Sequence, residues 1–330
     1  MTRGQEAIAE LVTAFAGNDP AAVGRVLERH PELKARLNEP APGVPFGGTA
    51  LLEATRRGDR EMVDVLLRAG ADINARSRWW AGSFGVLDHD HDPDFVSFLI
   101  ERGATVDVHA AARLGMLDRL DELLTDDPGL VHARGGDGQT PLHFAKTIDV
   151  ARFLLDRGAD IDARDIDHEG TPAQWMVRDR PEVARFLVAR GCTTDILLAA
   201  ALGDVALVRK LLDADPANIR THVTEKYFPK RDPRAGGHIY IWTLGANKTA
   251  HVIARELGHD EIFETLMDRS PDGLKLAVAC ALGDKALADA LIAGNPRLPR
   301  TLSDDEQRAL SDAAEENNTR RFTGTPRWSA

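Results

Sequence analysis

Paired apolar residues recur along the chain, each pair near the end of an amphipathic segment. Apolar side chains in these segments follow the three-to-four-residue spacing of a helix with one buried face. Nine pairs align: Val26-Leu27, Leu66-Leu67, Leu99-Ile100, Leu123-Leu124, Leu154-Leu155, Leu187-Val188, Leu211-Leu212, Leu266-Met267 and Leu291-Ile292. Five of them have a glycine eight residues before the first member: Gly58, Gly115, Gly203, Gly258 and Gly283. This spacing predicts nine helical pairs with tight links between antiparallel helices.

One stretch contains a complete unit, GQTPLHFAKTIDVARFLLDRGADIDAR at residues 138–164. Thr140 predicts a helix cap, with Pro141 at the first helical position, where its missing N–H costs nothing. The segment 140–145 resembles the ankyrin repeat, whose sign is T-P-L-H-x-A on a 33-residue period. The resemblance covers roughly residues 5–300 and implies an all-α solenoid with short β-hairpin fingers.

One repeat cannot bury its apolar face alone, so the units must stack on one another. We expect residues 1–300 to form a single ankyrin-repeat solenoid. Residues 301–330 begin like a first helix and then abandon the pattern. They predict an incomplete repeat or a divergent C-terminal cap with a mobile tail.

The steps between successive pairs are irregular: 40, 33, 24, 31, 33, 24, 55 and 25 residues. Steps of 24 or 25 residues leave no room for a finger. The units around Gly85 and Thr140 have too few residues for a full first helix. Since first helices and fingers line the concave face in ankyrin proteins, the trimmed helices predict a hollow there.

The 55-residue step contains an insertion, residues 220–248. Alternation at Val223, Glu225 and Tyr227, and again over 239–242, predicts an elongated hairpin finger. The insertion carries six basic and two acidic residues, so it is locally about +4.

The composition is that of a globular protein, with 43% hydrophobic residues and a net charge of −11 over 330 residues. This charge argues against a surface that tracks nucleic acid or an anionic membrane. No apolar run approaches membrane-spanning length, and the N-terminal segment is amphipathic rather than a signal peptide. Cys192 and Cys280 lie far apart in sequence and predict neither a disulfide framework nor a cysteine metal site. We therefore expect a cytoplasmic protein without a cofactor.

Trp79 and Trp80 follow a predicted finger tip, where exposed tryptophan is typical of a binding anchor. The alternative is that both side chains seal the gap above the trimmed third unit. Trp175 and Arg178 lie three residues apart on a predicted first helix, where they share one face or pack against the next hairpin.

The segment DHDHDP, residues 88–93, places His89 and His91 among carboxylates such as Asp90. His168 repeats an Asp-His pair further along. These groups are suited to a transition metal or to acid–base chemistry, although acidic residues before a helix are also ordinary stabilisers of its N-terminus.

The insertion combines cations with aromatic faces, a composition suited to a carboxylate, a phosphate or an acidic peptide. Its candidate binding residues are Lys226, Tyr227, Arg231, Arg234, Tyr240 and Trp242. A solvated loop that caps neighbouring repeats explains the same residues structurally.

The sequence thus predicts a protein-binding ankyrin-repeat scaffold that uses its concave face and fingers. The alternative is an enzyme or small-molecule binder, metal-dependent or acting on an anionic substrate, with a concave pocket lined by histidine, tryptophan and arginine. In that case His89, His91 and His168 supply acid–base groups or metal ligands. A protein partner is expected, a small anionic ligand is the alternative, and neither nucleic acid nor membrane is expected.

Overall fold

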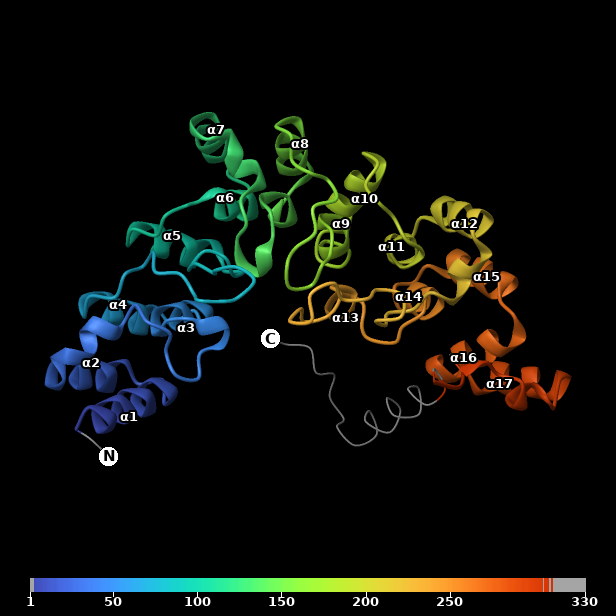
Figure 1. Ribbon diagram of the computed structural model, residues 1–330, viewed down its shortest axis with the longest axis horizontal. Helices are drawn as coiled ribbons and strands as arrows, with labels where there is room; N and C mark the ends of the chain where they lie inside the picture. The colour runs from blue at the N-terminus through green and yellow to red at the C-terminus, as the bar shows by residue number, and fades with distance from the viewer. Residues whose placement is uncertain (1–2, 305, 309, 311–330) are drawn as a thin grey trace. The chain divides into compact units, whose positions relative to one another are not determined.

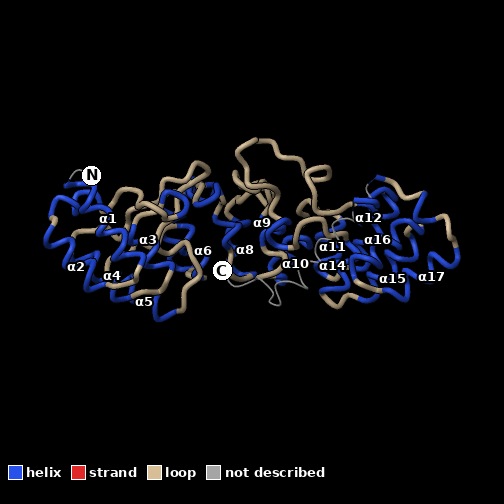
Figure 2. The backbone as a smooth tube through the Cα atoms, turned by 90° about the horizontal axis from the view of Figure 1, so that it is seen from below, coloured by secondary structure: helices blue, strands red, loops and turns tan. Residues whose placement is uncertain are grey.

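The computed structural model describes residues 3–304, 306–308 and 310. This part of the chain consists of helices, turns and loops, with no strand (Figures 1 and 2). It divides into two compact units, Met1–Pro172 and Ala173–Ala330. The single continuous solenoid over 1–300 remains a prediction.

The first unit contains the helical pairs α1/α2, α3/α4 and α6/α7, and the single second helices α5 and α8 (Figure 1). The α-helices are α1 (Arg3–Ala16), α2 (Pro20–Arg29), α3 (Ala50–Arg56), α4 (Arg60–Arg68), α5 (Pro93–Glu101), α6 (Val108–Leu114), α7 (Leu117–Asp126) and α8 (Ile148–Asp156). Short 3-10 helices are η1 (Pro31–Arg36), η2 (Pro45–Gly47), η3 (Pro128–His132), η4 (Gly136–Gly138) and η5 (Pro141–Phe144).

The second unit contains the pairs α11/α12, α14/α15 and α16/α17, together with α10. Its elements are α10 (Pro181–Ala189), α11 (Ile196–Leu202), α12 (Val205–Ala214), η6 (Pro216–Arg220), α13 (Tyr240–Thr243), α14 (Ala250–Glu256), α15 (Asp260–Arg269), α16 (Asp272–Leu282), α17 (Lys285–Gly294) and η7 (Leu298–Arg300). The four-residue helix α9 (Pro172–Trp175) crosses the boundary between the units.

The nine predicted second helices are confirmed, because every apolar pair lies in one of α2, α4, α5, α7, α8, α10, α12, α15 or α17. The five link glycines have φ values between 68° and 76°, a left-handed conformation that side chains disfavour. The short steps are confirmed as well. For example, only residues 102–107 separate α5 from α6, and 270–271 separate α15 from α16.

The trimmed first helices are shorter than predicted. No helix stands between α4 and α5, and the fifth unit has only the 3-10 helix η5. There Thr140 is the cap, as predicted, and it forms a capping box with His143, in which the Thr140 N–H donates to His143 Nδ1 at 3.1 Å. His143 Nε2 also lies 3.3 Å from the carbonyl oxygen of Gly170, in the next repeat.

The paired strands predicted for the insertion are wrong. Its two ends do meet, through one isolated bridge between His222 and Thr249, but residues 240–243 form helix α13. Ile239 and Tyr240 are both buried whereas Trp242 is 57% exposed. Consecutive buried residues fit one face of a helical turn and not the alternation of a strand.

The predicted cap or incomplete repeat at 301–330 lies largely outside the described residues. Leu302 is buried with Leu276 and Leu298, and Leu310 packs against this cluster. Arg220 donates to the Glu306 carboxylate at 2.8 Å. Leu302, Glu306 and Leu310 thus contribute to the packing of the second unit.

Candidate functional site

Two tight turns project from the first unit, each with two successive residues in the left-handed conformation. These are Phe46-Gly47, with φ 59° and 62°, and Asp137-Gly138, with φ 54° and 72°. A backbone hydrogen bond from the fourth to the first residue closes each turn, at 3.0 and 3.1 Å. Two positive φ values and this hydrogen bond define a two-residue hairpin turn.

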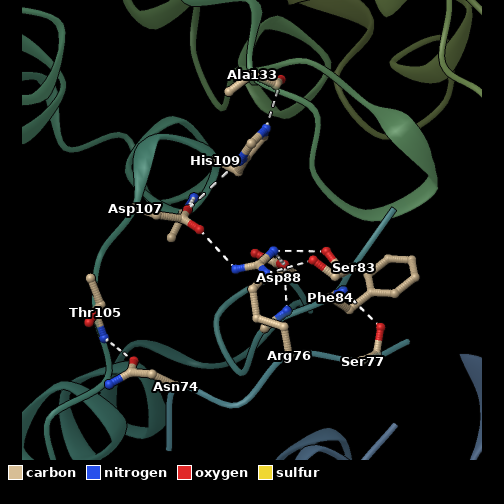
Figure 3. A network of polar contacts seen from close by, with 12 residues as sticks. Asn74, Arg76, Ser77, Ser83, Phe84, Asp88, Thr105, Asp107, His109 and Ala133 are labelled. Carbon is tan, nitrogen blue, oxygen red and sulfur yellow. Dashed lines mark hydrogen bonds and ion pairs between the residues drawn. The ribbon is translucent and has the colours of Figure 1, made fainter. Parts of the chain in front are cut away.

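Arg76 holds the long loop that replaces the first helix of the third unit (Figure 3). Its guanidinium donates to the carboxylate of Asp88 at 2.8 Å and to that of Asp107 at 3.0 Å. It also donates to the side-chain and backbone oxygens of Ser83, at 2.9 and 2.8 Å. Since Asp107 caps α6, one cation joins the loop to the next repeat.

Residues 78–83 form a small loop that carries both tryptophans. The loop is closed at its base, because the Ser77 N–H donates to the Phe84 carbonyl and the Phe84 N–H donates to Ser77 Oγ, both at 2.9 Å (Figure 3). The Arg78 N–H donates to the Gly47 carbonyl at 3.0 Å, which fixes this loop beside the turn of Phe46.

Aromatic rings follow one another across these loops, and we call the series the aromatic row. Ring centroids are separated by 6.2 Å for Trp80–Trp79, 5.0 Å for Trp79–Phe46, 5.4 Å for Phe46–Phe84, 5.8 Å for Phe84–His89 and 6.4 Å for His89–His91. Both tryptophans are half-buried, whereas Phe46 is 44% exposed. The tryptophans therefore both fill the gap above the third unit and border the exposed Phe46.

His89, Asp90 and His91 do not form the predicted metal-ligand set. Asp90 is exposed and pairs with Arg113 at 2.7 Å, while His91 Nε2 lies 3.0 Å from the Val86 carbonyl. Burial lowers the pKa of both His89 and His91, so both imidazoles are neutral at pH 7. They serve as flat, uncharged members of the aromatic row.

His168 instead meets two carboxylates, Asp137 and Asp167. One ligand atom from each residue lies within 4.8 Å of the others, and this is the one such group of three among the described residues. We call Asp137, Asp167 and His168 the carboxylate–imidazole cluster. The backbone assembles it, since the N–H groups of Ile166 and Asp167 donate to the Asp137 carbonyl at 2.8 and 3.1 Å.

Asp165 shapes the loop that carries two members of the cluster. Its buried carboxylate accepts from the backbone N–H of His168 at 2.6 Å and of Gly170 at 2.7 Å. The Asp167 side chain is only 6% exposed and lies 3.6 Å from His168 Nε2. The loop thus holds a carboxylate and an imidazole in fixed positions beside Asp137.

The surroundings of Asp137 shift the pKa of its carboxyl group. Burial raises its pKa to about 6, the neighbouring His168 acts in the opposite direction, and Asp167 and Asp165 raise it further. The indole N–H of Trp79 faces this carboxylate and also lowers the pKa. The pair nevertheless falls outside hydrogen-bond geometry, so Asp137 Oδ1 and Trp79 Nε1 are both buried without a hydrogen-bond partner among the described residues.

The loops of the aromatic row and of the cluster pack directly on each other. A Cβ atom at Gly136 would lie 2.1 Å from the Phe84 ring, and one at Gly138 would lie 2.3 Å from Ile166. Only glycine permits this approach. Residues 44–48, 77–84, 134–138 and 165–169 therefore form one continuous surface, which we call the finger surface.

The predicted hollow above the third unit is mostly filled. A space of about 30 Å³, roughly one water molecule, remains beside Phe46, Phe84 and His89. A larger cavity of about 270 Å³ lies elsewhere in the first unit, against Leu11 and Phe15 of α1, and no histidine or tryptophan lines it.

The predicted binding residues Trp175 and Arg178 belong to the second unit and lie outside the finger surface. Trp175 is the last residue of α9, and Arg178 lies in the turn beyond it, so the two do not share a helix as predicted. Helix α9 ends early because Met176 and Val177 are drawn into the core before Pro181 begins α10.

The exposed cations of the insertion lie beside local partners. Lys226 Nζ lies 5.3 Å from the Tyr227 ring centroid, and Arg234 pairs with Asp232 at 2.7 Å. Arg231 is exposed on the same loop. A ligand role for these residues and for the exposed Trp242 remains a prediction.

Tyr240 is a core residue and does not reach the surface. It is fully buried, and its hydroxyl donates to the Asp195 carboxylate at 2.8 Å. Asp195 also accepts from Gln174 at 3.0 Å and from the backbone N–H groups of Leu197 and Leu198, both at 2.9 Å. Four donors around one buried carboxylate anchor the insertion to the start of α11.

Sequence reasoning missed Phe46 and Asp137. Each lies three residues before the threonine that begins a helix, at the centre of a finger turn. Aligning the two turns with each other would have indicated that these residues occupy equivalent positions at turn centres.

Known proteins share parts of this chain. Residues 108–197 match the family described as ankyrin repeats (3 copies), and residues 46–78 match the ankyrin repeat. The serine/threonine-protein kinase VIK of Arabidopsis thaliana is 46% identical over 66 residues, which cover 17% of this chain and 15% of the kinase. The ankyrin repeat and SAM domain-containing protein 6 of Mus musculus is 30% identical over 120 residues, or 34% of this chain and 13% of that protein.

The chain therefore spans only about one seventh of the length of these relatives. No helix of the described residues has the length and apolar character to cross a membrane. The two family matches, the nine second helices and the His143 capping box together identify the chain as an ankyrin-repeat protein.

Proposed function

We propose that the chain binds another protein through the finger surface of its first unit. Ankyrin repeats are generally protein-binding scaffolds, and their curved repeats present extended contact surfaces. The observation that carries the proposal is Phe46, an aromatic side chain that is 44% exposed at the tip of a turn. The left-handed backbone disfavours phenylalanine at this position, where asparagine or glycine fits better.

The surroundings of Phe46 suit a binding hot spot. Trp79 packs edge-on against it at 5.0 Å and Trp80 follows at 6.2 Å from Trp79, so partly buried aromatic area lies around an exposed centre. The partner segment that fits this surface has an apolar side chain that can cover the exposed Phe46 ring.

The alternative of an enzyme has less support. His89 and His91 meet edge-on within the aromatic row, and Trp175, Arg231 and Arg234 belong to the second unit. We place the binding function in the cytoplasm, in keeping with the absence of a disulfide among the described residues.

Selection from a display library of natural protein segments tests the proposal. We expect enriched segments to bind the full chain with micromolar affinity and Phe46→Ala to weaken that binding at least about tenfold. Met116→Ala is the matched control, because Met116 is 40% exposed on α7 of the same unit. Equal loss in both variants, or no loss in either, would exclude the finger surface as the contact.

A further inference from the structure

The carboxylate–imidazole cluster has the donor atoms of a metal site. Asp137 comes from one finger turn, and Asp167 and His168 come from the next, so residues about 30 apart in sequence converge. Two carboxylate oxygens and one imidazole nitrogen form a mixed set that Zn²⁺, Co²⁺ and Mn²⁺ accept readily. Ca²⁺ and Mg²⁺ prefer oxygen donors alone.

Asp137 lacks the partners that a buried carboxylate requires. Its Oδ1 atom is buried and has no hydrogen-bond partner among the described residues. The nearby arginines are used elsewhere, since Arg134 donates to the carbonyls of Gly138 and Arg164, both at 2.6 Å. A buried acceptor without a donor is costly, and a bound cation removes that cost.

We propose that Asp137, Asp167 and His168 bind one divalent transition-metal cation such as Zn²⁺. Tetrahedral Zn²⁺ with ligand distances of about 2.0–2.2 Å places neighbouring ligand atoms about 3.3 Å apart. The three atoms lie within 4.8 Å of one another, so small side-chain movements complete the site. Three protein ligands leave a fourth position open to water or to a side chain of a bound partner.

The bound cation would join two finger turns that are otherwise held by backbone hydrogen bonds. It would also lie close to Trp79, whose indole N–H faces Asp137. That proximity supplies an optical readout, because paramagnetic Co²⁺ quenches a neighbouring indole. The proposal does not depend on the protein-binding function, and either one can fail alone.

The test is titration of the full, tag-free chain, stripped with EDTA, with ZnCl₂ and CoCl₂ by calorimetry and tryptophan fluorescence. We expect one cation per chain, an increase in the unfolding midpoint and quenching by Co²⁺. Trp79→Phe is expected to abolish most of the quenching while leaving the calorimetric affinity within about twofold. Asp137→Asn and His168→Gln are each expected to weaken binding at least about tenfold.

The control is His132→Gln, which changes an exposed imidazole of η3 and is expected to leave the affinity unchanged. The weakest affinity of interest corresponds to a Kd of about 1 mM. If the wild-type chain binds no cation at about 1 mM, the proposal is overturned, whatever the variants do. Equal affinity in the wild type and in a folded Asp137→Asn, or equal affinity for Zn²⁺ and Ca²⁺, would overturn it too.

Discussion

Two regions of the chain depart from the regular repeat, and they differ in what the departure leaves exposed. Around residues 72–92 a first helix is missing, and the replacement loop forms a surface with an exposed phenylalanine and a buried carboxylate oxygen that lacks a partner. Around residues 220–248 an insertion is added, and its central tyrosine is fully buried on a carboxylate with four donors.

The comparison teaches that irregularity alone does not indicate function. The insertion has the more suggestive composition, with six basic residues and two tyrosines. Its key contact, Tyr240 to Asp195, nevertheless stabilises the second unit. The finger surface has fewer charged residues, but among the described residues it has an exposed phenylalanine and two buried polar atoms without a hydrogen-bond partner, Asp137 Oδ1 and Trp79 Nε1.

The largest expected effect follows from Asp195→Ala. It removes the cap of α11 and leaves the buried Tyr240 hydroxyl and the Gln174 amide without their acceptor. We expect a loss of about 3–5 kcal/mol in the free energy of unfolding, measured in urea. Asp232→Ala, in the exposed part of the same insertion, should leave the midpoint unchanged. A small effect of Asp195→Ala would break the structural interpretation of the insertion.

Acid should weaken the second unit through His251, which follows the insertion on α14. Burial lowers the pKa of this imidazole from 6.5 to about 4. Protonation is therefore disfavoured in the folded state. The stability is fully present above pH 6.5 and is lost as the pH falls towards 4, by up to about 3 kcal/mol.

His251→Gln should remove most of that acid sensitivity, since glutamine can still hydrogen-bond to Ser270, whose hydroxyl lies 2.8 Å from His251 Nε2. Urea unfolding at pH 7 and pH 5 measures the difference. The same loss between these pH values in both proteins would contradict the assignment to His251.

Arg76→Met should destabilise the first unit by about 2–3 kcal/mol. It leaves Asp88, whose side chain is 3% exposed, without its cation. The expected loss in the free energy of unfolding is smaller than for a fully buried ion pair, because the Arg76 side chain is 35% exposed. Hydrogen exchange should show the loss of protection in α6, whose cap Asp107 also contacts Arg76. Arg152→Met removes an exposed pair with Asp149 and should cost less than about 0.5 kcal/mol.

Among the site residues, Phe46→Ala should have the smallest effect on stability. The side chain is 44% exposed, so its removal should change the free energy of unfolding by less than about 1 kcal/mol. A loss of several kcal/mol, seen in the same urea titration, would show that Phe46 is needed for folding and would weaken its assignment as a contact residue.

Most of the fold could be predicted because its determinants are local. Helical spacing, link glycines such as Gly115 and caps such as Thr140 act within about ten residues, so the sequence indicates them directly. The insertion was mispredicted because its apolar residues at 239–242 fit a strand or a single helical turn equally well over so short a run.

The site could be predicted only in part. Trp79, Trp80 and His168 stand out by composition, but Asp137 joins His168 only through the stacking of two finger turns. Likewise, nothing local distinguishes Asp195 from the other cap residues. Its role depends on Tyr240, which lies 45 residues away.

The comparison of the two regions is tested most directly by the affinity of one selected protein segment for the wild type, Phe46→Ala and Trp242→Ala. Both aromatic side chains are exposed, at 44% and 57%, one on the finger surface and one on the insertion. We predict at least a tenfold loss, about 1.4 kcal/mol, for Phe46→Ala and less than a twofold change for Trp242→Ala. A loss confined to Trp242→Ala would contradict the assignment and place the contact on the insertion.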